Sequence, residues 1–226
     1  MFARLALLAL SAVTTASAYA NPGACSGTCV NTHDPAVIRR SDGTYFRFST
    51  GGTIQIHTAP AITGPWTFAC TMLGDAAKLT VTDNPGTDLW APDVALVDDL
   101  YCVYYSVSSF GTQESAIGVA TSSSMDCGTF TDLGATGVAS HTGSRYNAID
   151  PNLVDTGSGY ELLFGSFWQN LFIVGMSDPP TSPSGSSVQV AYDPAGTHAV
   201  EGGFMINTNG YYYLFFSAGQ CCGYDS

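Results

Sequence analysis

The 226-residue sequence holds 18 acidic and 6 basic residues, which gives a formal net charge of −12. Six basic side chains are too few to build the clustered positive surface that nucleic acids or anionic membranes require, so we expect neither as a partner. Hydrophobic residues make up 45% of the chain and charged residues only 11%, a composition that predicts a folded core rather than disorder.

Residues 1–20 are predicted to be a secretory signal peptide. Arg4 supplies a positive start, residues 5–13 form a short apolar run, and residues 16–18 and 18–20 are both small-residue cleavage signals. The alternative, a membrane anchor, is disfavoured because the apolar run is too short to span about 30 Å of hydrocarbon. We therefore expect a secreted, extracellular protein in which residues 21–226 form one domain.

All seven cysteines follow the predicted cleavage point: Cys25, Cys29, Cys70, Cys102, Cys127, Cys221 and Cys222. In an exported protein most of them should be oxidised, and an odd number leaves one without a partner. Cys25 and Cys29 are close enough in sequence to close a small loop. The four histidines do not space with the cysteines in a finger pattern, which disfavours a structural zinc site.

One unit of structure recurs four times along the chain. An acid is followed three residues later by an apolar residue at Asp34, Asp93, Asp150 and Glu201, at intervals of 51 to 59 residues. Turn residues and then an aromatic strand follow each acid, at residues 45–49, 101–106, 160–166 and 211–217. A unit of this size, made of short antiparallel strands, is typical of a β-propeller blade.

The repeat therefore predicts an all-β propeller, in which the innermost strands of all blades line one channel. Acids at the same register should point at one axis, and such clustering indicates a functional site because it costs stability. A β-sandwich is the alternative, but two packed sheets would not be expected to repeat an acid so regularly. The last unit starts at Glu201 and cannot be completed by residue 226, so we expect an incomplete propeller of about three and a half to four blades.

Four segments carry a family resemblance: His33-Asp34-Pro35, residues 89–94 (LWAPDV), residues 146–153 (YNAIDPNL) and residues 198–202 (HAVEG). Together they resemble glycoside hydrolase family 43, in particular its secreted fungal endo-1,5-α-L-arabinanases. The resemblance implies a five-bladed propeller that is truncated here before the last blade. It also implies an enzyme that needs no cofactor for its chemistry, with a possible structural calcium whose ligand region is missing from this chain.

The resemblance implies an inverting mechanism with Asp34 as general base, Glu201 as general acid, and Asp150 as pKa modulator and orienter. In a five-bladed ring Asp34 and Glu201 would face each other across the channel and leave room for a water, as inverting enzymes require. Asp34 and Asp150 each precede a proline, which is expected to keep their backbone extended. Asp93 matches the register of the acids, but we expect a structural or hydrogen-bonding role for it.

Sugar binding needs flat aromatic faces together with amides and hydroxyls. We expect such contacts from residues near the strand ends, namely His33, Trp90, Phe110, Asn147, Ser166 and Trp168. His33 has a second possible role in orienting Asp34. Loop packing is the alternative for Phe110, and core packing is the alternative for Ser166 and Trp168.

The expected function is endo-hydrolysis of 1,5-α-L-arabinofuranosidic bonds in plant cell-wall arabinan by a monomeric enzyme. An exo-acting arabinofuranosidase or β-xylosidase of the same family is the first alternative. A non-catalytic carbohydrate-binding propeller is the second.

Overall fold

A computed structural model of the protein describes residues 23–219, and every regular element in that range is a β-strand. The predicted signal peptide, Cys221 and Cys222 lie outside the described residues. Within residues 23–219, no helix has the length and apolar character that a membrane span needs. The all-β prediction is confirmed.

Three four-stranded antiparallel sheets follow one another along the chain, each with its strands in sequence order. The first contains β1 (Ala36–Arg39), β2 (Tyr45–Ser49), β3 (Gln55–Ala59) and β4 (Thr67–Thr71). The second contains β5 (Leu89–Val97), β6 (Leu100–Val107), β7 (Ser115–Ser122) and β8 (Thr131–Ser140). The third contains β9 (Asn152–Asp155), β10 (Tyr160–Phe164), β11 (Leu171–Gly175) and β12 (Val188–Ala191).

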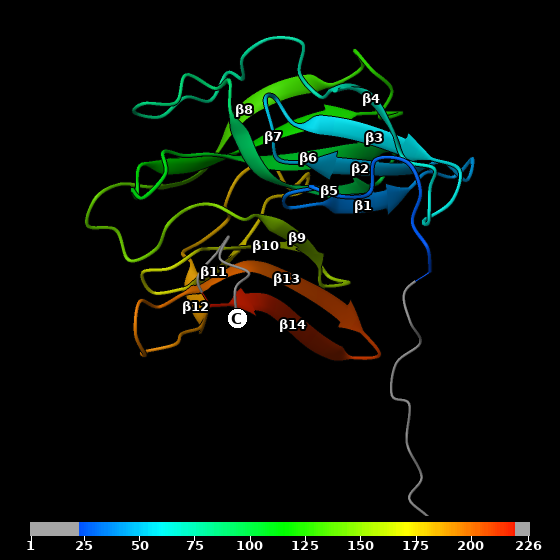
Figure 1. The fold of residues 1–226 in the computed structure, drawn as a ribbon. Helices are drawn as coiled ribbons and strands as arrows, with labels where there is room; N and C mark the ends of the chain where they lie inside the picture. The colour runs from blue at the N-terminus through cyan, green and yellow to red at the C-terminus, as the bar shows by residue number, and fades with distance from the viewer. Residues whose placement is uncertain (1–22, 220–226) are drawn as a thin grey trace, which may run out of the picture.

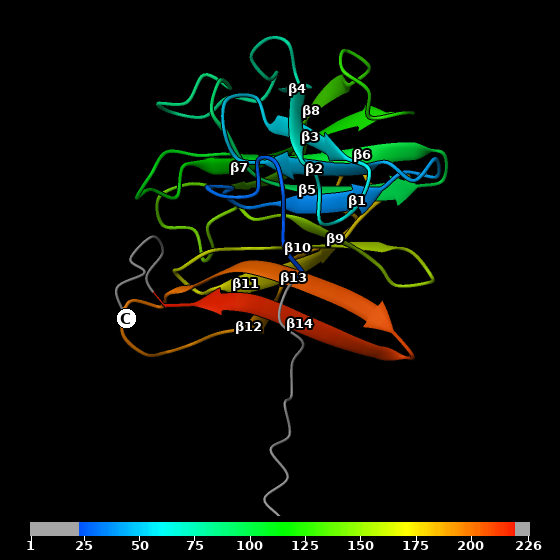
Figure 2. The same ribbon diagram turned by 45° about the vertical axis from the view of Figure 1, so that its right-hand side comes forward.

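A fourth sheet has two described strands, β13 (Val200–Thr208) and β14 (Tyr211–Ala218). Figures 1 and 2 show it as the end layer of the molecule, beyond β9–β12. The first strands of successive sheets, β1, β5, β9 and β13, lie next to one another in that order. This arrangement brings the starts of the four repeats together, as the propeller prediction requires.

The aromatic strands expected from the sequence form the second strand of each sheet; β6 and β14 are longer than expected by one or two residues, and β10 is shorter. The strand expected over residues 160–166 ends at Phe164, because Gly165 has a φ of 126°. A Cβ at Gly165 would collide with the carbonyl oxygen of Asn170. The tight turn that follows β10 therefore depends on glycine, and it places Ser166 in a loop.

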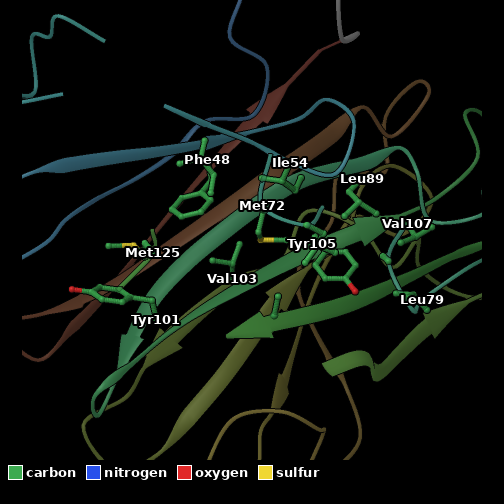
Figure 3. Close-up of a cluster of buried hydrophobic side chains, with 14 of the residues drawn as sticks. Phe48, Ile54, Met72, Leu79, Leu89, Tyr101, Val103, Tyr105, Val107 and Met125 are labelled. Atoms are coloured by element: carbon green, nitrogen blue, oxygen red, sulfur yellow. The ribbon is translucent and has the colours of Figure 1, made fainter. Parts of the chain in front are cut away.

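Apolar side chains fill the spaces between neighbouring sheets. Figure 3 shows the first cluster, where Phe48, Ile54 and Met72 of the first sheet region meet Val103 and Tyr105 of β6. A second cluster lies between the second and third sheets, and a third one joins the third sheet to β13 and β14. Burial of these faces holds the sheets in place and so fixes where their first strands begin.

Two disulfides link described cysteines. Cys25 pairs with Cys29, as expected, and Cys70 of β4 pairs with Cys127 in the loop between β7 and β8. Cys102 is buried in β6 and is the free thiol within residues 23–219. The second disulfide ties the outer strand of the first sheet to the second sheet.

The outer face of β13 and β14 carries large exposed side chains. Phe204 and Phe215 are 48% and 56% exposed, and Tyr211 and Tyr213 are exposed as well. Contiguous apolar surface of this kind on a soluble protein usually marks a contact surface.

Candidate active site

The three predicted catalytic acids lie at the starts of three first strands. Asp34 and Asp150 stand two residues before β1 and β9, and Glu201 is the second residue of β13. All three are half-buried. The pKa of Asp150 is raised to about 7, mainly by burial; the negative charges of Asp34 and Glu201 act in the same direction, and the hydrogen bond from Gly202 N–H opposes them. The structure thus brings the carboxylates of Asp34 and Glu201 within electrostatic reach of Asp150.

The backbone at two of these acids differs from the expectation. Asp34 has a φ of 48° and Asp150 a φ of 57°, so both are left-handed and the prediction of extended backbone before proline is wrong. Aspartate tolerates this conformation better than most residues. At Asp150 it is held by two hydrogen bonds: its own N–H donates to Ser106 Oγ at 3.1 Å, and Gly202 N–H donates to its Oδ2 at 2.9 Å.

Asp93 does not occupy the register of the other acids, so that part of the prediction is wrong. Ala91 takes the place instead, since it precedes a proline and has the same left-handed backbone, with a φ of 43°. Asp93 lies two residues after Ala91 within β5, and the pairing of β5 with β6 is irregular between Trp90 and Asp93. A one-residue or two-residue shift at a bulge changes where a side chain points.

The hydrogen-bonding role expected for Asp93 is confirmed. Its buried carboxylate accepts bonds from the Leu153 backbone N–H at 2.8 Å and from Asn152 Nδ2 at 3.3 Å. Burial raises the pKa of Asp93 to about 6, although these bonds oppose the shift. Asp93 therefore joins β5 to β9 and stands apart from the three clustered acids.

Glu201 is aimed by an irregularity in its own strand. The pairing of β13 with β14 shifts between Glu201 and Phe204, and Gly202 in between has a φ of 60°. Ser166 Oγ donates a 2.9 Å hydrogen bond to Glu201 Oε2. Ser166, predicted to bind substrate, therefore contacts the predicted general acid directly.

Asp34 has two neighbours on its carboxylate. Thr50 Oγ1 donates to Oδ2 at 2.6 Å, and His33 Nε2 lies 3.3 Å from Oδ1. The contact expected between His33 and Asp34 is present, whereas Thr50 was not predicted. A sequence signal for Thr50 does exist: Thr50 and Ser166 are hydroxyl residues that each lie 16 positions after the acid of their own repeat.

The remaining predicted binding residues differ in the exposure of their side chains and in their hydrogen bonds. Phe110 stands in the loop between β6 and β7 with 93% of its side chain exposed. Trp90 is half-buried, and its Nε1 donates to Asp88 Oδ2 at 2.9 Å. Asn147 is buried, and its Oδ1 accepts a 2.6 Å bond from Ser115 Oγ, which fixes the orientation of the amide.

Trp168 lies in the turn between β10 and β11, where backbone strain is concentrated. Phe167, Trp168 and Asn170 all have positive φ values, of 52°, 45° and 58°. Asn170 Nδ2 donates to the carbonyl oxygen of His198 at 2.7 Å, which ties the turn to the segment that leads into Glu201. Backbone strain of this kind is common at functional sites.

No metal-binding cluster of three or more histidine, cysteine, aspartate or glutamate side chains is present within residues 23–219. The chemistry below uses only the side chains of this chain.

Comparison with known proteins places this arrangement in a family. The model of Glycosyl hydrolases family 43 matches residues 29–226. This chain belongs to glycosyl hydrolase family 43. The arabinan endo-1,5-alpha-L-arabinosidase A of Aspergillus niger is 56% identical over 209 residues, which are 92% of this chain and 64% of that protein. The family 43 chain thus spans less than two thirds of the length of this curated relative.

Solved structures of family 43 proteins share the fold. The GH43 endo-arabinanase from Bacillus licheniformis superposes with a TM-score of 0.78 at 31% identity, over 88% of this chain and 70% of that one. An exo-1,5-alpha-L-arabinanase from a bovine ruminal metagenomic library superposes with a TM-score of 0.77 at 30% identity, over 85% and 66%. Both endo-acting and exo-acting enzymes are therefore similar to this chain.

Proposed function

We propose that the whole protein is an inverting glycoside hydrolase that cleaves 1,5-α-L-arabinofuranosidic bonds within arabinan. The similarity to the Aspergillus niger arabinosidase supports the substrate, and the three clustered carboxylates support the chemistry. The further proposal of a five-bladed propeller, which this chain fills in part, agrees with the share of the relative that it spans. Secretion is supported by the two disulfides, which form in oxidising compartments.

In this mechanism Asp34 is the general base. Its side chain is 36% exposed, so a water can reach it and lose a proton to it. The resulting hydroxide attacks the anomeric carbon from the face opposite the leaving sugar. Glu201 donates its proton to the departing glycosidic oxygen, and a base and an acid on opposite faces give inversion.

Asp150 is the proposed modulator and orienter. With a pKa near 7, it changes its charge in the range where such a site works, and its charge acts on both other carboxylates. Its hydrogen bond from Gly202 N–H ties it to the residue that follows Glu201. This coupling of Asp150 to both proposed catalytic partners is the observation that carries the proposal.

The test is to incubate the protein with linear 1,5-α-L-arabinan and to follow the products by chromatography and by proton NMR. We expect shortened oligosaccharides whose new reducing ends first appear as the β anomer. Retention of the α anomer would overturn the inverting mechanism, and the absence of any cleavage would overturn the enzyme proposal.

An exo-acting enzyme is the second candidate, favoured by the similarity to the ruminal exo-arabinanase. It would release a single small product from chain ends and would leave long chains nearly unshortened at early times. A comparison of polymer length with released small sugar separates the two candidates. Rapid hydrolysis of nitrophenyl arabinoside would further favour exo action.

A further inference from the structure

Thr50 lies where two sheets meet at the proposed base. It directly follows β2, and its backbone N–H donates to the carbonyl oxygen of His33 at 3.1 Å. Its Oγ1 accepts a hydrogen bond from the Ala91 N–H at 2.8 Å and lies 2.6 Å from Asp34 Oδ2. One hydroxyl thus connects the end of β2, the carboxylate before β1 and the start of β5.

The chemical nature of each group decides which atom donates and which accepts in these hydrogen bonds. A backbone N–H can only donate, so Thr50 Oγ1 must be the acceptor toward Ala91. The single hydroxyl proton is then free for Asp34, whose Oδ2 accepts it. A general base must also be held in a fixed orientation to take a proton from water, so the arrangement favours the geometry that the proposed reaction needs.

The other neighbour of the Asp34 carboxylate holds it less firmly. The His33 side chain is 59% exposed, and its Nε2 is 3.3 Å from Oδ1, a contact that solvent weakens. Thr50 contacts the opposite oxygen, Oδ2, at a shorter distance. Thr50 is therefore the neighbour that fixes the orientation of the Asp34 carboxylate more firmly.

Hydroxyls recur at the same place in the next two repeats. Ser106 Oγ accepts from Asp150 N–H at 3.1 Å, just as Thr50 Oγ1 accepts from Ala91 N–H. Ser166 Oγ donates to Glu201 Oε2 at 2.9 Å. In all three sheets a hydroxyl group near the end of the second strand forms a hydrogen bond with a residue at the start of the next sheet. The contact of Thr50 therefore belongs to a set of hydroxyl hydrogen bonds that recurs from sheet to sheet.

We propose that Thr50 is a positioning residue that holds the Asp34 carboxylate oriented toward water. This inference rests on the proposed function, because it concerns how the proposed base works. Thr50 acts through Asp34 and through the Ala91 amide and has no contact with the sugar in this role. Its loss should therefore slow turnover without weakening substrate binding.

The experiment compares Thr50→Val, which keeps the shape and removes the hydroxyl, with Thr50→Ser, which keeps the hydroxyl. On linear arabino-oligosaccharides we expect Thr50→Val to lower kcat by about 10- to 100-fold with KM within about twofold. Thr50→Ser should recover kcat to within a few-fold of the unaltered protein. In Thr50→Val, hydrogen exchange at the Ala91 amide should become faster, which is a readout independent of activity.

Thr136→Val is the matched control for a lost threonine hydroxyl. Thr136 is buried in β8, donates to the Ile117 carbonyl oxygen at 2.8 Å and accepts from Val138 N–H at 3.2 Å. It should lower thermal stability and leave kcat unchanged. The inference is overturned if Thr50→Val keeps kcat within twofold, or if Thr50→Ser and Thr50→Val lose kcat equally. A protein that is inactive before any substitution refutes the proposed function itself, so the two failures are distinguishable.

Discussion

The backbone N–H of Gly202 donates a 2.9 Å hydrogen bond to Oδ2 of Asp150, across 52 residues of sequence. It joins the start of the third sheet to the residue that follows Glu201 in the fourth. Of the two proposed partners of Asp150, Glu201 lies in the fourth sheet and Asp34 lies directly before the first sheet. This hydrogen bond helps to hold the half-buried Asp150 carboxylate near the carboxylates of Asp34 and Glu201.

Glu201→Gln tests the proposed general acid. Glutamine cannot supply a proton, so kcat on arabinan should fall by about 10²- to 10⁴-fold, while binding of arabino-oligosaccharides stays nearly unchanged. Steady-state kinetics and calorimetric binding measure the two effects. Glu161→Gln, in β10, is the matched control and should keep full activity. Full turnover in Glu201→Gln would remove Glu201 from the mechanism.

Asp150→Asn tests the raised pKa through stability. The folded-state pKa of about 7 lies above the ordinary value of 3.8, so the charged form is disfavoured by folding. The stability that this group contributes is complete below pH 4 and is lost as the pH rises through 7. Asp150→Asn lacks that loss, so at pH 8 its free energy of unfolding should exceed that of the unaltered protein by up to about 4 kcal/mol, and its melting temperature should be higher.

The pH dependence distinguishes this effect from general stabilisation. The advantage of Asp150→Asn should shrink between pH 8 and pH 4, as thermal unfolding at several pH values would show. An advantage of the same size at every pH would contradict the assigned pKa. Activity should fall in the same variant, because the proposed modulator is gone.

Asp93→Ala separates the structural acid from the catalytic ones. The substitution leaves the Leu153 N–H and Asn152 Nδ2 without their acceptor in a buried place, which costs about 1–3 kcal/mol. Urea unfolding should show this loss, and kcat should remain within a few-fold under conditions where the variant is folded. A large fall in kcat with unchanged stability would reverse the assignment.

Phe110→Ala tests the exposed aromatic as a sugar-binding surface. With 93% of its side chain exposed, Phe110 contributes little to folding, so the melting temperature should stay within about 1 °C. If it stacks on arabinan, KM should rise several-fold while kcat changes little. Phe68, which is 57% exposed on β4, provides a control at Phe68→Ala that should alter neither constant. An unchanged KM in Phe110→Ala would remove Phe110 from the proposed sugar-binding surface.

The sequence by itself determined the all-β class, the four repeats and the acids that start three of them. The reason is physical: alternating aromatic strands and turn residues act over short distances, so a repeated pattern reports a repeated local structure. The pairing of Cys25 with Cys29 was predictable for the same reason, since only a few residues separate them.

Tertiary structure decided which residues meet across sheets. Ala91, and not Asp93, has the backbone conformation of Asp34 and Asp150, and the irregular pairing of β5 with β6 at this point is not revealed by the spacing of the acids. The contact of Thr50 with Ala91, and the disulfide between Cys70 and Cys127, join segments that are brought together only when apolar faces pack. Local pattern places each acid at a strand start, whereas the packing of one sheet on the next sets its backbone, its hydrogen bonds and its pKa.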